Sequence, residues 1–175
     1  LVCNPHIDGI SYDGYCGAGV IYKLLESAIN DEVLLRNLQM YAGIATVADV
    51  MPMQRDNWKI TRSAIAAIRA GLEGQTLPPA LALLFEKQGI AHPSQLNEDY
   101  FAWQLSPLIN AMGRLQDYGA KKVFSFLDHP HPPSDICEEI IANNQLRKGL
   151  VTQGMEELCE KPSVQAAKAA AQKAP

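Results

Sequence analysis

Apolar residues recur at the spacing of a single helix face along most of this chain. Two segments show the i, i+3, i+4 spacing most clearly: Val20, Ile21, Leu24, Leu25 and Ala28 in the first, and Ile60, Ala64, Ile65 and Ile68 in the second. No stretch approaches the roughly 20 consecutive apolar residues that a membrane-spanning helix needs. The pattern therefore predicts a mainly helical protein and argues against an integral membrane protein.

The composition is typical of one soluble globular domain. The chain has 175 residues, 47% of them hydrophobic, and a formal net charge of −4. At this length about 70% of the unfolded chain's surface can be buried without metal or disulfide cross-links. The acidic balance argues against nucleic-acid binding through bulk charge, although a local basic face is compatible with it. The four cysteines form no CxxC pair, which argues against a zinc site and favours a reducing, cytoplasmic compartment.

Residues 1–3 predict a short strand, which is the single strand that the sequence indicates. Residues 1–3 are a short apolar run that Asn4 and Pro5 end, as at the end of a buried strand. We expect this strand to belong to a parallel sheet whose other members lie elsewhere, and the glycines and aspartates of residues 6–15 predict a loop. Because the chain begins on a leucine in the middle of an apolar run, we expect it to be a fragment.

Helix start and stop residues divide the rest of the chain. Asp31 is a candidate N-cap for a second helix, which ends at the small-residue stretch GIATVADV, and Gly71 is the expected end of a third helix over 56–71. Later segments predict a short helix from Pro78 to Gln88, two or three short helices over 97–127 punctuated by Pro107, Gly113 and Gly119, and a long, exposed, bridging helix over 134–160. The low-complexity tail over 161–175 carries no functional weight.

Asp49 is the outstanding candidate for a functional residue. Its neighbours in GIATVADVMPM are small or apolar. Burying an ionised carboxylate costs several kcal/mol unless it meets a cation or several hydrogen-bond donors. The residue types alone leave two interpretations open, a turn or helix cap before Pro52 and a metal ligand.

Two further groups could bind an anion. Gly17 and Gly19 stand at a helix start, where backbone N–H groups can approach an anion, although glycines at such positions also serve close packing. The residues around Arg114 in SPLINAMGRL are mostly apolar, so its guanidinium needs an anion. Phosphate and the nearby Asp117 would satisfy it equally well.

The histidines give weaker signals. His6 follows the end of the predicted strand, where open α/β sheets place their sites. His129 and His131 could bind a metal together with Asp128, but their alternation with prolines favours a solvated connector.

Six blocks of sequence carry more information when they are taken in order: NPH, CGAGVIYKLL, GIATVADVMPM, RDNWKITRSAI, SPLINAMGRL and IIANNQLRKG. Together they resemble the RecJ branch of the DHH phosphoesterase family, which are single-strand-specific 5′ exonucleases. The resemblance covers about residues 1–158, and ADVMP and NAMGRL are its most specific blocks. It implies an α/β DHH phosphoesterase domain, of which residues 1–133 are the C-terminal part, with a connecting helix over 134–160 and a tail over 161–175.

The resemblance also implies an activity. Members of the RecJ branch are metal-dependent 5′-to-3′ exonucleases that hydrolyse single-stranded DNA in repair and recombination, using two Mn²⁺ or Mg²⁺ ions that activate a water. By the motif match Asp49 is a metal-ligating catalytic residue, and Asn110 and Arg114 position or neutralise phosphate. The CGAGV helix packs under the metal centre, and His6 lies in a loop without a fixed role. Single-stranded DNA is the implied partner.

The chain departs from the family pattern in ways that limit what it can do alone. The first three family motifs, including the Asp-His-His triplet, and the glycine-rich C-terminal domain have no counterpart, and Leu108 and Trp58 stand where the family commonly has basic residues. One aspartate cannot hold two divalent cations, so we expect the isolated chain to be inactive.

Several explanations are open. The chain is a fragment of a nuclease, one half of a split nuclease completed by a second polypeptide, or a noncatalytic module. A related phosphodiesterase acting on oligonucleotides or cyclic dinucleotides is the alternative activity. The state of Asp49 discriminates between them, because a module predicts protein donors to its carboxylate and a fragment predicts an open, unpaired one.

Overall fold

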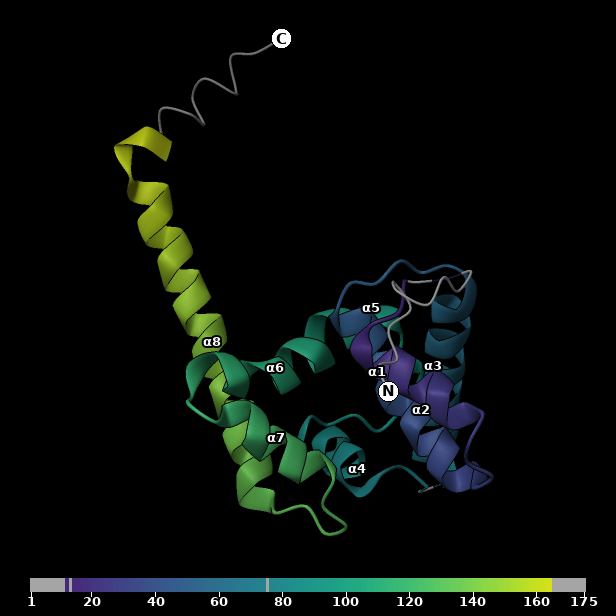
Figure 1. The fold of residues 1–175 in the computed structure, drawn as a ribbon. Coiled ribbons are helices and arrows are strands. Elements are labelled where there is room, and N and C mark those ends of the chain that lie inside the picture. The colour runs from purple at the N-terminus through teal and green to yellow at the C-terminus, as the bar shows by residue number, and fades with distance from the viewer. Residues whose placement is uncertain (1–11, 13, 75, 165–175) are drawn as a thin grey trace.

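The computed structural model describes residue 12 and the ranges 14–74 and 76–164, and the regular elements of this part of the chain are helices (Figure 1). In chain order they are α1 (Gly17–Glu26), α2 (Glu32–Ala48), α3 (Arg55–Gly74), α4 (Pro79–Lys87), the 3₁₀ turn η1 (Pro93–Gln95), α5 (Glu98–Tyr100), the π-helical η2 (Phe101–Leu105), α6 (Ser106–Leu115), α7 (Gly119–Leu127) and α8 (Ser134–Glu160). The helical periodicity of the sequence is confirmed in these elements.

The predicted α/β fold, with one short strand of a parallel sheet, is wrong for this structure, because residues 12, 14–74 and 76–164 contain no strand. Apolar residues at helical spacing are instead buried between packed helices. The strand expected over residues 1–3 lies outside the described residues, and so does His6. Within the described part, no helix combines the length and apolar composition needed to cross a bilayer.

Two helices extend beyond their predicted ends, and each contains a glycine at a close packing contact. Asp31 caps α2 as predicted, its Oδ1 accepting from the Leu34 N–H at 2.9 Å. The small-residue stretch that was expected to end α2 is helical up to Ala48, and a Cβ added at Gly43 would lie 2.2 Å from the Ala64 Cβ of α3. Gly43 therefore fixes how closely α2 and α3 pack.

Gly71 serves packing as well. It lies inside α3, which ends at Gly74, and an added Cβ would lie 2.7 Å from Leu77 Cδ2. The prediction that Gly71 ends the third helix is therefore wrong. Gly89 does follow the end of α4 in the left-handed region, with φ +68°, as a helix-terminating glycine should.

A proline is accommodated inside a helix rather than breaking it. The chain is helical from Glu98 to Leu115, although Pro107 lies within this range. Pro107 has no backbone N–H to donate, and the π-helical η2 lies just before it. The Ser106 N–H and hydroxyl both donate to the Phe101 carbonyl, the hydroxyl at 2.6 Å. The helix interruption that was predicted at Pro107 is therefore absent, and the helix changes type locally before the proline.

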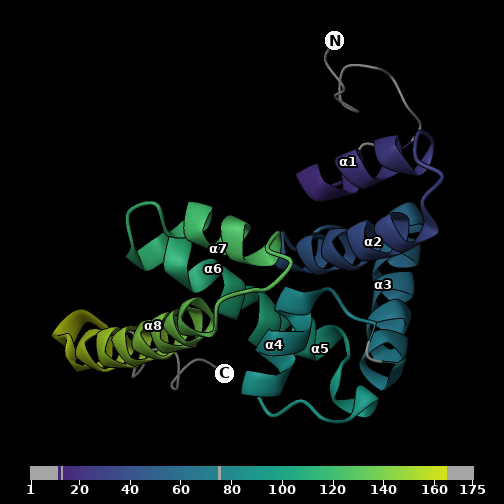
Figure 2. The same cartoon turned by 90° about the horizontal axis from the view of Figure 1, so that it is seen from below.

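The main core lies where α2, α3, α4, η2, α6, α7 and α8 meet. Its largest fully buried side chains include Met40, Ile68, Leu81, Leu84, Phe85, Phe101, Leu105, Met112, Phe126 and Ile140. Helix α1 packs on the outer side of α2, away from α8 (Figure 2). One side of α1 is left open, since Ile21 and Leu24 are about half exposed.

Helix α8 is buried at its start and exposed along its second half. Cys137 and Ile140 are fully buried, and exposed ion pairs join Lys87 of α4 to Glu138 at 2.7 Å and Lys122 of α7 to Glu139 at 2.8 Å. The second half of the helix extends away from the body (Figure 1). The prediction of an exposed helix is confirmed for this second half only, where five large apolar side chains are exposed: Leu146, Leu150, Val151, Met155 and Leu158.

Candidate functional site

Asp49 is an exposed carboxylate at the C-terminal end of α2. Its backbone N–H donates to the Ala45 carbonyl at 2.9 Å. No described residue donates a hydrogen bond to its side chain or forms an ion pair with it. The apolar neighbours in the sequence therefore do not bury it, and it is not an N-cap. A negative charge at the negative end of a helix dipole is unfavourable, by about 0.3–1 kcal/mol. Asp49 is the C-cap of α2 through its backbone, and its side chain makes no stabilising contact with a described residue.

The residue after Asp49 is strained. The end of α2 is a Schellman motif, in which Met51 N–H donates to the Thr46 carbonyl and Val50 N–H to the Val47 carbonyl, both at 3.1 Å. The left-handed position of this motif usually holds glycine, but here it holds Val50 at φ +53° with 87% of its surface exposed. A left-handed conformation costs a residue with a Cβ about 1–2 kcal/mol.

We expect Val50→Gly to raise the melting temperature by about 2–4 °C, because relief of the left-handed strain stabilises a chain of this size by about 1 kcal/mol. Gly89 gives the matched control, since it holds the same position after α4 at φ +68° and has open space around an added Cβ. Gly89→Val should lower the melting temperature. A destabilised Val50→Gly protein would show that Val50 makes contacts that outweigh its strain.

The loop after Asp49 is tied to the start of α1. The buried Asn57 side chain donates to the Gly14 carbonyl at 2.7 Å and to the Pro52 carbonyl at 3.1 Å. Tyr15 donates to Asp56 Oδ2 at 2.5 Å, and this hydrogen bond lowers the pKa of Asp56. These bonds hold Asp49 in a fixed place relative to α1.

A cavity of about 650 Å³ lies between α1, α2, α6 and α7, and Asp49 and Asn110 both line it. Most of its wall is apolar: Leu34, Leu38, Tyr41, Ile44, Ile109, Phe124 and Leu127. Ala18 of α1 also lines it, whereas its described neighbours Gly17 and Gly19 do not, and the Gly19 N–H donates to Cys16 Sγ at 3.4 Å. The start of α1 therefore reaches this cavity without offering it the Gly19 amide.

A second, smaller cavity of about 130 Å³ adjoins the first and is cationic. Asn110, Arg114 and Arg147 line it, and it shares Asn110, Ala48 and Ser106 with the larger cavity. Arg114 has no hydrogen bond or ion pair with any described residue, so Asp117 does not satisfy it. Asn110 thus connects the carboxylate end of the site to two guanidinium groups.

Arg147 is the residue of this site that sequence reasoning missed. It comes from α8, where its Nε and Nη2 donate to Asn144 Oδ1 at 3.2 and 3.1 Å. These bonds orient the guanidinium and leave its other N–H groups for a ligand. The available signal was the one-turn spacing of Asn144 and Arg147 in the polar block IIANNQLRKG.

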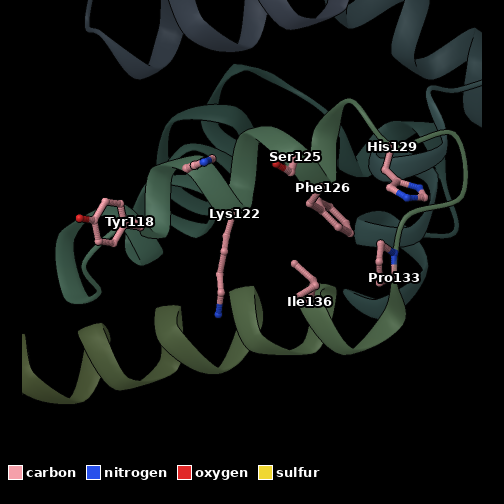
Figure 3. Close-up of a pocket in the computed structure, with 8 residues that line it drawn as sticks. Tyr118, Lys122, Ser125, Phe126, His129, Pro133 and Ile136 are labelled. Carbon is pink, nitrogen blue, oxygen red and sulfur yellow. The ribbon is translucent and has the colours of Figure 1, made fainter.

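The histidines that the structure describes do not form a metal site. His129 lines a pocket of about 270 Å³ between α7 and α8, where Figure 3 shows it beside Pro133, with the apolar Phe126 and Ile136 close by. Its Nδ1 accepts from the His131 N–H at 3.0 Å, and Lys122 in the same pocket is paired with Glu139. The pocket is mostly apolar, and His129 also lines the larger cavity that Asp49 lines.

The described residues alone do not fit a two-metal centre. No group of three or more His, Cys, Asp or Glu side chains among them could hold a metal ion. Mn²⁺ and Mg²⁺ each need several oxygen ligands, and Asp49 offers one carboxylate. Asp49 could therefore serve only as one ligand of a larger set.

The chain matches no family model. Over 73% of its length it is 32% identical to the single-stranded-DNA-specific exonuclease RecJ of Salmonella typhimurium. The chain is similar to a segment of RecJ. RecJ of Escherichia coli K12 is 33% identical over 91% of the chain, and RecJ of Bacillus subtilis 168 is 24% identical over 91%.

These similarities confirm the resemblance to RecJ inferred from the six sequence blocks. The chain spans 22%, 30% and 20% of the lengths of the Salmonella, Escherichia and Bacillus RecJ proteins, respectively. The assignment to the wider DHH family stays a prediction.

Proposed function

We propose that this chain is part of a RecJ-like, metal-dependent 5′-to-3′ exonuclease that hydrolyses single-stranded DNA. In this proposal Asn110, Arg114 and Arg147 form the surface that binds the strand, which we call the strand-binding wall. The similarity to three RecJ proteins supports the substrate class. One observation carries the assignment to residues: Asn110 lines both cavities and so links Asp49 to Arg114 and Arg147. This arrangement offers a carboxylate for a cation beside guanidinium groups for phosphates.

The state of Asp49 is the one that a fragment of an enzyme predicts. Its carboxylate is exposed, and no described residue donates a hydrogen bond to it. In the proposal Asp49 is one ligand of an Mn²⁺ or Mg²⁺ ion. The other ligands come from outside the described residues, either elsewhere in the same protein or in a second polypeptide, so the isolated chain binds DNA without cutting it.

Arg114 and Arg147 supply the phosphate contacts in this proposal. We expect Arg114→Ala/Arg147→Ala to weaken binding of a fluorescent oligo(dT) by about 10- to 100-fold, because hydrogen bonds to charged groups contribute about 1.5–3 kcal/mol each and exposed ones less. The slope of log K against log salt should become shallower by about 1.4, since each phosphate contact to a single strand contributes about 0.7. Fluorescence anisotropy over a salt series measures both.

The matched control removes two cations from α3. Lys59 pairs with Asp56 at 3.6 Å, the Arg62 guanidinium lies 5.1 Å from the Trp58 ring centre, and neither residue lines either cavity of the site. Lys59→Ala/Arg62→Ala changes the net charge equally and should leave affinity within about twofold, since distant exposed charges are screened. Equal losses in both double variants would show that only bulk charge matters and would contradict the proposal.

A further inference from the structure

Trp103 is a large aromatic side chain without a partner in the described part of the chain. It lies in the π-helical η2, 72% of its surface is exposed, and its indole makes no hydrogen bond or ring contact with a described residue. The other tryptophan, Trp58, is less exposed and carries Arg62 over its ring. Exposure alone is common for a single surface residue, so the position of Trp103 relative to the cationic cavity decides its meaning.

Trp103 lies one turn before the residues of the cationic cavity. Pro107, Asn110 and Arg114 follow one another at steps of three and four residues, which is the spacing of one face of α6, and Trp103 precedes Pro107 by four residues in the π-helical η2. Pro107, Asn110 and Arg114 all line the cavity, and so does Ala102, the neighbour of Trp103. Arg114 lies eleven positions after Trp103, which is a rise of about 16 Å at α-helical geometry.

Charge changes along this face. Glu98 and Asp99 are exposed just before Trp103, and the cations Arg114 and Arg147 lie beyond it. A phosphate would therefore be repelled near Asp99 and attracted near Arg114. Between these two regions the exposed indole of Trp103 offers a neutral, flat surface.

We propose that Trp103 is a stacking platform for a base of single-stranded DNA whose phosphates lie against Arg114 and Arg147. This inference rests on the proposed function and adds to it a residue that holds a base. Stacking on an aromatic side chain contributes to affinity whatever the base is, because each base has a π face. Trp103 thus favours strands with unpaired bases over duplexes, whose bases are already stacked.

The test separates Trp103 from Trp58. In the Trp58→Phe protein, Trp103 is the only tryptophan, so its fluorescence reports contact directly. Oligo(dT) is titrated into this protein, and an abasic strand of the same length, with the same phosphates and no bases, is titrated in parallel. Anisotropy of labelled strands gives the affinities of wild type, Trp103→Ala and Trp103→Phe.

We expect oligo(dT) to quench Trp103 and the abasic strand to leave it unchanged. Trp103→Ala should weaken oligo(dT) binding by about 5- to 150-fold, the equivalent of 1–3 kcal/mol per stacked base, and leave abasic binding unaltered. Trp103→Phe should restore most of the loss. The exposed position predicts unchanged thermal unfolding, and the quenching result stands even without a folded Trp103→Ala protein.

Two results would overturn the inference, and they differ in what else they overturn. If oligo(dT) binds with no quenching and with equal affinity to Trp103→Ala, the stacking role is wrong and the proposed function stands. If wild type binds neither strand, the proposed function is wrong as well.

Discussion

Asp49→Asn is expected to lower Mn²⁺-dependent cleavage by about 10³-fold or more in the enzyme proposed above, assembled with the polypeptide that supplies the other metal ligands. Loss of groups that only support metal ligands costs about 10- to 100-fold, and a direct ligand should cost more. The same substitution should leave the fold intact or stabilise it by about 0.3–1 kcal/mol, because it removes a negative charge from the negative end of α2. Cleavage of a 5′-labelled single strand and thermal unfolding measure the two effects.

Asp31 is the matched control, because it lies at the opposite end of the same helix and caps it. Asp31→Ala should cost about 1 kcal/mol of stability and leave cleavage near wild type. Opposite effects of the two aspartates would separate a functional carboxylate from a structural one. Normal cleavage with Mn²⁺ by the Asp49→Asn protein would show that Asp49 is not a metal ligand.

Gly43→Ala is expected to destabilise the chain by about 3 kcal/mol or to prevent its folding. The added Cβ would lie 2.2 Å from the fully buried Ala64 Cβ and 3.4 Å from the Ile60 carbonyl oxygen, so α2 and α3 would have to separate. Asp49 lies at the end of α2, so this separation would also displace the candidate site. Chemical denaturation with circular dichroism measures the loss.

Two variants test whether the clash is the cause. Gly149 lies in the exposed part of α8 with open space around it, so Gly149→Ala should stabilise the chain by about 0.5–1 kcal/mol. Adding Ala64→Gly to Gly43→Ala removes the facing Cβ and should restore much of the lost stability. If Gly43→Ala behaves like Gly149→Ala, the close approach of α2 and α3 is wrong.

The sequence was a good guide to the helices because their signals are local. The apolar spacing around Ile60 and Ile68, the N-cap Asp31 and the short helix ending at Gln88 each depend on residues within a turn or two. Pro107 and Gly71 misled the prediction, because a π-helical segment and a close contact with Leu77 are settled by packing. The α/β prediction failed for a related reason, since it came from three residues and a resemblance rather than from periodicity in the described chain.

The site could be predicted in part. Residue types and motifs predict Asp49, Asn110 and Arg114 as site residues, and in the structure these residues line two adjoining cavities. The exposure of Asp49 could not be read from its apolar neighbours, because it depends on what covers the end of α2. Arg147 was missed because its position beside Arg114 results from the packing of α8 on α6.

The most direct test of the strand-binding wall compares two DNA molecules of the same length. Binding of the unmodified chain to a labelled 20-nucleotide single strand and to the corresponding duplex is measured by anisotropy at low salt. We predict tighter binding to the single strand, because Arg114 and Arg147 line a cationic cavity that can receive phosphates and the unpaired bases are available for stacking. Equal or tighter binding to the duplex, or no binding to either, would contradict it.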